Sequence, residues 1–159
     1  MKLLLPFVLL LFYSSAQSQS RPTSCNDAAV LKSADSLLKL FDEHNYIALH
    51  KNSITMQSDY EVPIYVSLTK GERYVFAFVG DPTSRLFEYR IYDANDQRVA
   101  YEKQYATDRE KNIIIFSHLA DYTGYYLLRP VQINKQKKKD LCSFVMLFKQ
   151  IGQEKNSRK

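Results

Sequence analysis

Three histidines, His44, His50 and His118, are the side chains in this sequence best suited to acid–base or metal chemistry. No two of them have the spacing of a metal-ligand pair and none lies near a cysteine, so the sequence predicts no zinc site and no other cofactor. Ser117, His118 and Asp121 are the residue types of a hydrolytic triad. A triad also needs a strained turn that presents the serine and glycines that form an oxyanion hole, and neither accompanies these residues. The sequence therefore predicts no catalytic residues.

Asp93, Asn95 and Asp96 carry oxygens that could bind Ca²⁺. A calcium loop would also need a later glycine and a bidentate glutamate, which do not follow here. Aspartate and asparagine are equally favoured in β-turns. We therefore predict that Asp93 is a structural turn residue rather than a metal ligand.

Tyrosine is unusually frequent, with 12 residues in a chain of 159 that has no tryptophan. Nine of them cannot all point inward: Tyr60, Tyr65, Tyr89, Tyr92, Tyr101, Tyr105, Tyr122, Tyr125 and Tyr126. Exposed tyrosines suit glycan or peptide surfaces, because each ring offers apolar area and a hydroxyl group. Ordinary cross-strand pairing on a half-exposed sheet is the simpler explanation. As a functional hypothesis, we assign Tyr89, Tyr101 and Tyr105 to a binding face.

A basic turn at Lys137, Lys138 and Lys139 is the second candidate binding element. The chain has 22 basic and 17 acidic residues, for a net charge of +5, and much of the excess lies near this turn and in a basic tail at residues 152–159. That balance is not typical of a nucleic-acid-binding chain, so we predict no nucleic-acid partner.

The first 16 residues have the pattern of a secretory signal peptide. Lys2 is followed by an apolar stretch from Leu3 to Tyr13 and by small residues at Ser14, Ser15 and Ala16. The apolar stretch is well below the ~20 residues that span a bilayer as a helix, so no membrane span is expected. We predict that the protein is secreted or periplasmic after cleavage, with residues 17–23 as a linker.

Two cysteines in an exported chain most simply form one disulfide, between Cys25 and Cys142. Cys25 precedes the predicted helix and Cys142 lies in the last predicted strand, so the bond would join the two ends of the fold. The alternative is that Cys25 is a reactive thiol whose pKa is lowered near a helix N-terminus.

Hydrophobic periodicity predicts one amphipathic helix at residues 24–45 and strands over residues 46–151. Ser24 and Asp27 have the spacing of a capping box that would begin the helix. Pro63 interrupts a run of alternating residues from 60 to 68 and indicates an edge strand or a bulge there.

The segment from Arg73 to Asp96 reads as two strands joined by a turn, the first apolar on both faces. Residues 99–105 predict a more polar strand exposed on one side, and residues 113–116 predict a central strand buried on both. About eight short strands separated by turns indicate an all-β fold, an antiparallel β-sandwich preceded by one helix. An eight-stranded barrel enclosing a small apolar ligand is an alternative with the same strand count.

Three segments resemble the jelly-roll modules known as bacterial pre-peptidase C-terminal domains. They are residues 66–76 with Leu68, Lys70 and Gly71, residues 87–93 ending in Tyr92 and Asp93, and residues 123–128. The resemblance covers about residues 61–151 and implies a jelly-roll sandwich, although Asn95-Asp96 stands where that family usually has a glycine. The chain also resembles small exported Bacteroidetes proteins of unknown function, in which a helix precedes such a sandwich. Neither resemblance implies catalytic residues.

Residues 121–125 are similar to the tyrosine corner of immunoglobulin-like sandwiches, in which a tyrosine hydroxyl bonds to nearby backbone. Gly124 and Tyr125 are therefore predicted to form a structural turn, with Tyr125 or Tyr126 as the corner residue.

Our preferred hypothesis is an exported, non-enzymatic sandwich that binds a protein or glycan partner through its tyrosine-bearing face and loops. A small envelope hydrolase that uses His118 and Asp121 is the second hypothesis, and the ligand-binding barrel is the third. The sequence does not identify the partner or predict the oligomeric state.

Overall fold

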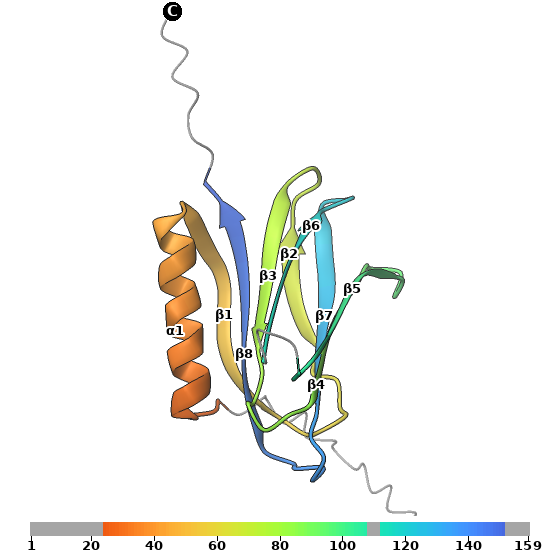
Figure 1. Ribbon diagram of the computed structural model, residues 1–159. Helices are drawn as coiled ribbons and strands as arrows, with labels where there is room; N and C mark the ends of the chain where they lie inside the picture. The colour runs from red at the N-terminus through yellow and green to blue at the C-terminus, as the bar shows by residue number, and fades with distance from the viewer. Residues whose placement is uncertain (1–23, 108–111, 152–159) are drawn as a thin grey trace, which may run out of the picture.

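The computed structural model describes residues 24–107 and 112–151 (Figure 1). The predicted signal peptide (1–16), the linker (17–23) and the basic tail (152–159) lie outside the described residues. One helix precedes eight strands: α1 (Ala28–Glu43), β1 (Tyr46–Met56), β2 (Ile64–Leu68), β3 (Arg73–Val79), β4 (Leu86–Tyr92), β5 (Arg98–Tyr105), β6 (Ile113–Leu119), β7 (Gly124–Ile133) and β8 (Leu141–Gln150).

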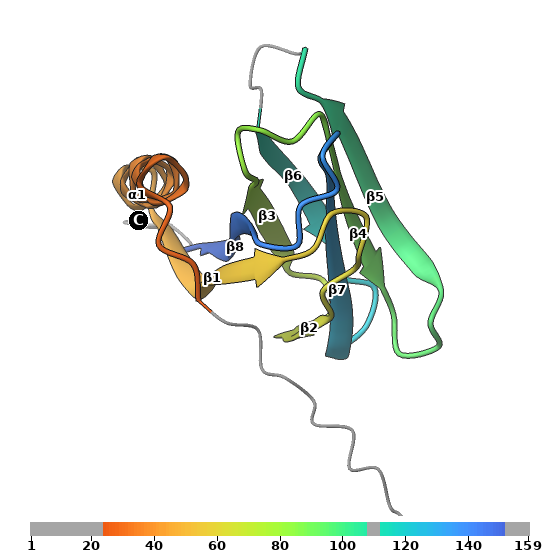
Figure 2. The ribbon, with the colours of Figure 1, turned by 90° about the horizontal axis from the view of Figure 1, so that it is seen from below.

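The strands form two four-stranded sheets that pack face to face, with orders β1-β8-β3-β6 and β2-β7-β4-β5 (Figure 2). The first four strands pair antiparallel with the last four in reverse order. The pairs are β1 with β8, β2 with β7, β3 with β6 and β4 with β5. This is the arrangement of a long hairpin rolled into two sheets, the jelly roll. The predicted antiparallel sandwich is confirmed, and the closed-barrel alternative is wrong because each sheet keeps its own edges.

Strand β3 is buried on both faces, as its apolar run predicts. Tyr74, Phe76 and Phe78 point between the sheets, where they pack against inward residues of the other sheet. Val75 and Ala77 point the other way and pack under α1. The second face is therefore covered by the helix rather than by a second sheet.

Helix α1 lies along the outer face of the β1-β8-β3-β6 sheet (Figures 1 and 2). Its N-cap is Asp27, whose carboxylate accepts hydrogen bonds from the backbone N–H groups of Ala29 and Val30 at 2.9 and 3.0 Å. The predicted start at Ser24 is three residues too early, because Asp27 itself caps the helix. Within the described residues, no helix is both long and apolar enough to cross a membrane.

Cys25 and Cys142 form a disulfide, with their Cα atoms 5.5 Å apart and 117 residues apart in sequence. The bond fixes the segment before α1 to the start of β8, so the predicted pairing is confirmed and Cys25 is not a free thiol. In the chain-entropy model, a loop of this length contributes up to about 4 to 5 kcal/mol.

Three details of the strands differ from the sequence prediction. β6 is an edge strand, not a central one, and Ile115 on its outer face is 40% exposed. β3 and β4 are consecutive but lie in different sheets, so their connection crosses the sandwich. β2 begins only at Ile64, directly after Pro63, which leaves the predicted strand shorter by several residues; it is the expected edge strand.

A tyrosine-bearing face as the candidate functional site

The outer faces of the two sheets differ in what covers them. α1 lies on the β1-β8-β3-β6 sheet, whereas the described chain places no helix on the outer face of the β2-β7-β4-β5 sheet (Figure 2). We call this second surface the tyrosine face and define it by the outward residues of those four strands. Side chains alternate along each strand, so the buried inward residues identify the outward ones.

Strand register arranges these outward residues in rows across the sheet. Read from β2 toward β5, the rows are Ser67 and Tyr125; Tyr65, Leu127, Tyr92 and Arg98; Arg129, Arg90 and Tyr101; Val131, Glu88 and Lys103; Ile133, Leu86 and Tyr105. Tyrosines therefore lie at both margins of the face, and charged side chains lie between them.

The marginal tyrosines of this surface are exposed on both sides of the face. On the β2–β7 side, Tyr65 is 68% exposed and Tyr125 is 70% exposed. On the β5 edge, Tyr101 and Tyr105 are 38% and 52% exposed. The predicted exposure of the β5 strand on one side is confirmed, and all four rings are exposed.

An ionic cluster occupies the middle of the tyrosine face. Arg90 and Arg129 face each other across β4 and β7, and two like charges in this position repel unless acids compensate them. Glu61 supplies one carboxylate oxygen to Arg90 and the other to Arg129, the latter at 3.6 Å. Glu88 binds Arg90, and Asp96 accepts a hydrogen bond from Arg129 at 2.8 Å.

Lys103 is a further cation of the cluster, and both Lys103 and Arg129 contact aromatic rings. Lys103 lies 3.6 Å from Glu88, and its ammonium group stands over the Tyr105 ring at 5.3 Å. The Arg129 guanidinium lies 4.2 Å from the centre of the Tyr92 ring, within the range of a cation–π contact. The charged groups are thus held in fixed positions beside aromatic surfaces.

Glu88 is ionised despite being largely buried. Burial alone would raise the pKa of its carboxyl group, but the hydrogen bond and charge of Arg90, the charge of Lys103 and a hydrogen bond from Tyr101 together lower the pKa below its usual value. The Glu88 carboxylate therefore stays negatively charged at neutral pH.

A groove of about 370 Å³ opens at one end of the tyrosine face. Tyr65 and Tyr125 form one wall, and the β4–β5 turn at Asp93 and Asp96 forms the other, with Arg129 between them. The groove therefore combines exposed aromatic rings with carboxylate and guanidinium groups.

Tyr89 does not belong to this surface, and its assignment to the binding face is wrong. Its side chain is fully buried and lies among the rings of Phe76, Phe78 and Phe116. Alternation explains the error, because Tyr89 is inward like Phe87 and Ile91, whereas the outward residues of β4 are its even-numbered ones.

The turns at the groove end have the structural role that the sequence predicts for Asp93. Its carboxylate accepts hydrogen bonds from the backbone N–H groups of Asn95 and Gln97, at 2.9 and 2.8 Å. Gly124 lies so close to Tyr122 that a Cβ atom there would come within 2.7 Å of the ring. A larger residue at position 124 would push this ring away.

The tyrosine corner is formed by Tyr122 and Tyr126, whose rings stack at 4.5 Å. The Tyr126 hydroxyl accepts from the Tyr122 N–H and donates to the Tyr122 carbonyl, and the Tyr122 hydroxyl donates to the Tyr125 carbonyl. Of the two predicted corner residues, Tyr126 is the one found. Tyr125 contributes only its backbone, because its ring points to solvent.

The structure does not assemble the triad-like residues. Ser117 and His118 are consecutive in β6 and point to opposite faces, and the Ser117 hydroxyl accepts a hydrogen bond from Arg73 at 3.4 Å. His118 stands against the Tyr126 ring, 6.0 Å between centroids. In the described part of the chain, no three His, Cys, Asp or Glu side chains are grouped as metal ligands.

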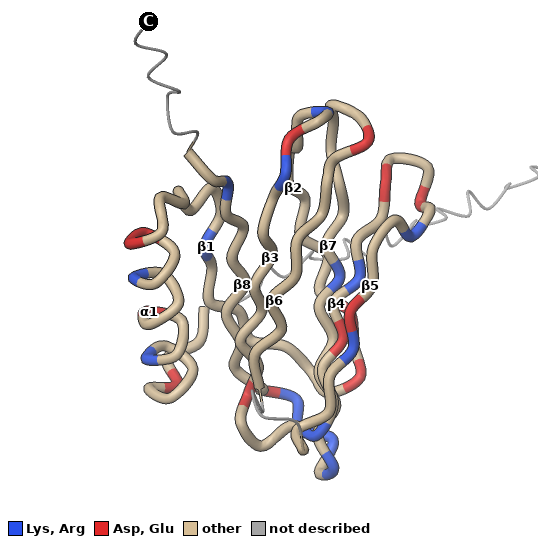
Figure 3. The backbone as a smooth tube through the Cα atoms, turned by 45° about the horizontal axis from the view of Figure 1, so that its top comes forward, with Lys and Arg blue, Asp and Glu red and all other residues tan. Residues whose placement is uncertain are grey.

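The basic turn lies away from the groove, at the opposite end of the sandwich. Lys137, Lys138 and Lys139 are in the β7–β8 connection, where Figure 3 shows blue residues gathered. They are therefore not part of the ionic cluster. The predicted binding residues do not include Tyr65, Arg90 or Arg129, although strict alternation from Val66, Ile91 and Leu128 places all three on one outer face.

Comparisons with known proteins give low similarities. No protein-family model matches the chain, and no curated protein matches it. The chain is similar to a GH115 4-O-methyl-α-glucuronidase (TM-score 0.41, 11% identity), of which it spans 14% while 64% of this chain is covered.

Two further solved structures are similar at the same level. One is described as CBM4 (TM-score 0.41, 12% identity, 71% of this chain and 83% of that chain). The other is an arabinose-bound GH51 α-L-arabinofuranosidase (TM-score 0.37, 9% identity, 82% of this chain and 25% of that chain). Similarities this low carry no argument about the function of this chain.

Proposed function

We propose that this protein is an exported, non-enzymatic binding module that recognises a glycan chain through the tyrosine face. The observation that carries the proposal is the arrangement of exposed tyrosines at both margins of a fixed ionic cluster. Tyr65 and Tyr125 lie at one margin and Tyr101 and Tyr105 at the other.

The chemistry of a sugar ring suits this arrangement. One face of a sugar ring presents C–H groups that pack on an aromatic ring, and its edge carries hydroxyl groups that need donors and acceptors. Guanidinium and carboxylate groups supply those donors and acceptors, often in pairs. The groove at Tyr65, Tyr125, Arg129 and Asp96 brings both kinds of group together.

The charge of the ionic cluster favours uncharged sugar units over a charged peptide along this part of the surface. Three cations, Arg90, Arg129 and Lys103, are paired with the three carboxylates of Glu61, Glu88 and Asp96. A charged ligand group placed here would have to compete with an existing partner, whereas a hydroxyl group can add to it. The cluster also needs little reordering on binding, which lowers its entropic cost.

A panel of soluble neutral polysaccharides in native affinity electrophoresis tests the proposal. The wild-type protein should be retarded by at least one of them, and Tyr65→Ala or Tyr125→Ala should weaken that retardation roughly tenfold, since a stacked ring is a typical binding hot spot. Leu119→Ala is the matched control, because Leu119 is 46% exposed on the other sheet. Unchanged retardation of both tyrosine variants would overturn the proposal.

A further inference from the structure

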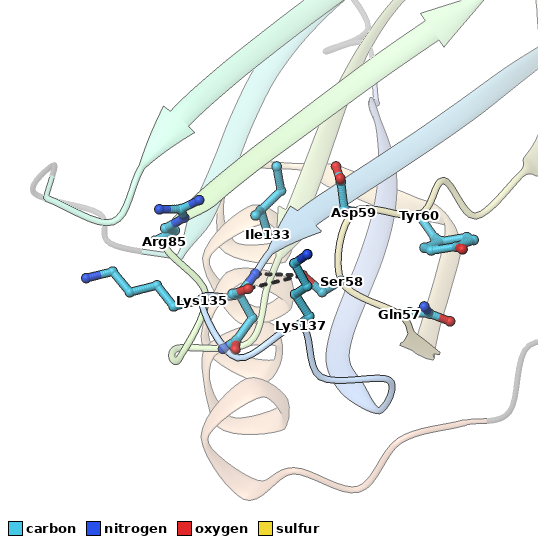
Figure 4. Close-up of a pocket in the computed structure, with 9 residues that line it drawn as sticks. Gln57, Ser58, Asp59, Tyr60, Arg85, Ile133, Lys135 and Lys137 are labelled. Atoms are coloured by element: carbon cyan, nitrogen blue, oxygen red, sulfur yellow. Dashed lines mark hydrogen bonds between the residues drawn. The ribbon is translucent and has the colours of Figure 1, made fainter.

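A second hollow, of about 510 Å³, lies at the end of the sandwich opposite the groove (Figure 4). It is formed where the chain leaves β1, enters β4 and turns from β7 into β8. Ile133, the last outward residue of β7, belongs to its wall. The hollow is therefore continuous with the tyrosine face, and Tyr125 at the other end of β7 lies roughly 26 Å away at about 3.3 Å per residue.

The lining of this hollow is positively charged. Arg85, Lys135 and Lys137 line it together with one carboxylate, that of Asp59. In the described part of the chain, none of these three cations forms an ion pair. This differs from the ionic cluster of the tyrosine face, in which every cation has an acidic partner. The hollow thus has positive charge that is free to meet a ligand.

The cations are carried by a turn that buried hydrogen bonds hold in place. Asn134 is 4% exposed, and its side chain donates to the Thr83 carbonyl at 2.8 Å and accepts from the Gln136 N–H at 2.7 Å. Its backbone N–H donates to the hydroxyl of Ser58 at 2.9 Å, a bond drawn as a dashed line that ends at Ser58 in Figure 4. Lys135 and Lys137 are therefore presented from a rigid base, although their own side chains reach into solvent.

We propose that this hollow, which we call the basic hollow, binds the anionic group of an acidic sugar, either a uronic acid carboxylate or a sulfate ester. Arg85 offers a planar fork that matches such groups, and Lys135 and Lys137 add point charges. Tyr60, which is 60% exposed at the rim, offers a ring for the sugar itself. The identification of the anion as part of a sugar rests on the proposed function, whereas the anion site does not.

Amide chemical-shift titration of the mature protein tests the basic hollow with small probes. Sodium glucuronate and glucose 6-sulfate should shift the amides of Arg85, Lys135 and Lys137, while glucose, the uncharged match, should not. Whichever charged sugar binds more tightly identifies the source of the anion. The shifts should diminish at high ionic strength, because exposed charges are screened.

The variants separate this site from the tyrosine face. Lys135→Gln combined with Lys137→Gln should weaken glucuronate or glucose 6-sulfate binding roughly fivefold, from the sum of two exposed charge contacts. Lys32→Gln, on the exposed side of α1, is the control and should have no effect. Tyr65→Ala should leave this binding unchanged, so a failure of the proposed glycan face would not be mistaken for a failure of the basic hollow.

Three results would overturn the proposal. These are no saturable shift with either charged sugar, equal shifts with glucose, and binding of inorganic sulfate as tight as that of both charged sugars, which would indicate an adventitious ion only.

Discussion

The hydroxyl of Tyr89 lies deep between the two sheets and has no hydrogen-bond partner among the described residues. Three phenylalanine rings surround the side chain, and burial raises the pKa of the phenol far above its usual value. A buried hydroxyl group without a partner loses its hydrogen bonds to water and forms no others in their place. This lowers the free energy of unfolding by about 1 to 3 kcal/mol.

Tyr89→Phe should therefore increase stability, by about 1 kcal/mol or more, because it removes the unpaired hydroxyl and keeps the ring. Urea unfolding of the purified protein measures the change. Tyr126→Phe is the matched control and should instead lose about 1 kcal/mol, since the Tyr126 hydroxyl bonds to the Tyr122 backbone. A Tyr89→Phe variant less stable than wild type would show that the hydroxyl has a partner.

His118 makes stability depend on pH. Its Nε2 atom is buried without a partner, and burial lowers the pKa of the ring, although Asp121 partly opposes the shift. Because the unfolded histidine titrates near 6.5, the unfolded state binds more protons than the folded state below that pH. The contribution of His118 is complete above about pH 6.5 and is lost as pH falls through the lower folded pKa.

His118→Gln should accordingly lose less stability than wild type between pH 7 and pH 5. His50, whose pKa burial also lowers, gives a slope of the same sign and stays in both proteins. Urea melts at several pH values compare the two slopes. Identical slopes would contradict the assigned burial of the His118 ring.

At the scale of the elements, the strands of the sandwich differ sharply in burial. β3 lies between the other sheet and α1, whereas β5 is an edge strand with one face in solvent. Phe76 in β3 is fully buried and stacks with Phe116 at 5.5 Å, while Tyr101 in β5 is 38% exposed. Substitutions in the two strands should therefore affect stability very differently.

Phe76→Ala should cost about 3 to 5 kcal/mol, from the lost transfer energy and the cavity left behind. Tyr101→Ala should cost less, about 1 to 2 kcal/mol, because part of the Tyr101 ring stays in water and its removal from an edge strand leaves no enclosed cavity. Urea unfolding of the two variants and of the wild type measures both losses of stability. Equal losses would mean that the burial of the two strands is wrong.

The sequence predicts the positions of the strands better than it predicts which strands pair with each other. Alternation correctly identifies the strand around Phe76 and the polar strand around Tyr101, and the two cysteines of a chain with a predicted signal peptide correctly predict the disulfide. Strand pairing depends on contacts between distant segments, and no local sequence pattern contains them. The apolar run at Ile115 therefore predicts a central strand, although β6 is an edge strand of its sheet. Tyrosine is common on binding surfaces, but the inward position of Tyr89 in the alternation of β4 buries its ring between the sheets.

At the scale of the whole molecule, the jelly roll leaves one broad sheet face without a covering element in the described chain. α1 and the disulfide occupy the side of the β1-β8-β3-β6 sheet, so the tyrosine face is the remaining sheet surface (Figure 2). Figure 3 shows acidic and basic residues side by side along β4 and β5, and basic residues gathered at the β7–β8 turn. This charge distribution fits the proposed binding of neutral sugar units at the face and of an acidic group at its end.

Chemical-shift mapping with a glycan that the protein binds is the most direct test of the tyrosine face. We expect the largest amide shifts on binding in β2, β7, β4 and β5, centred on Tyr65, Leu127, Tyr92 and Tyr101. Residues of α1 should not shift. Shifts confined to α1, β1 or the outer face of β6 would contradict the claim that this protein binds glycans through the tyrosine face.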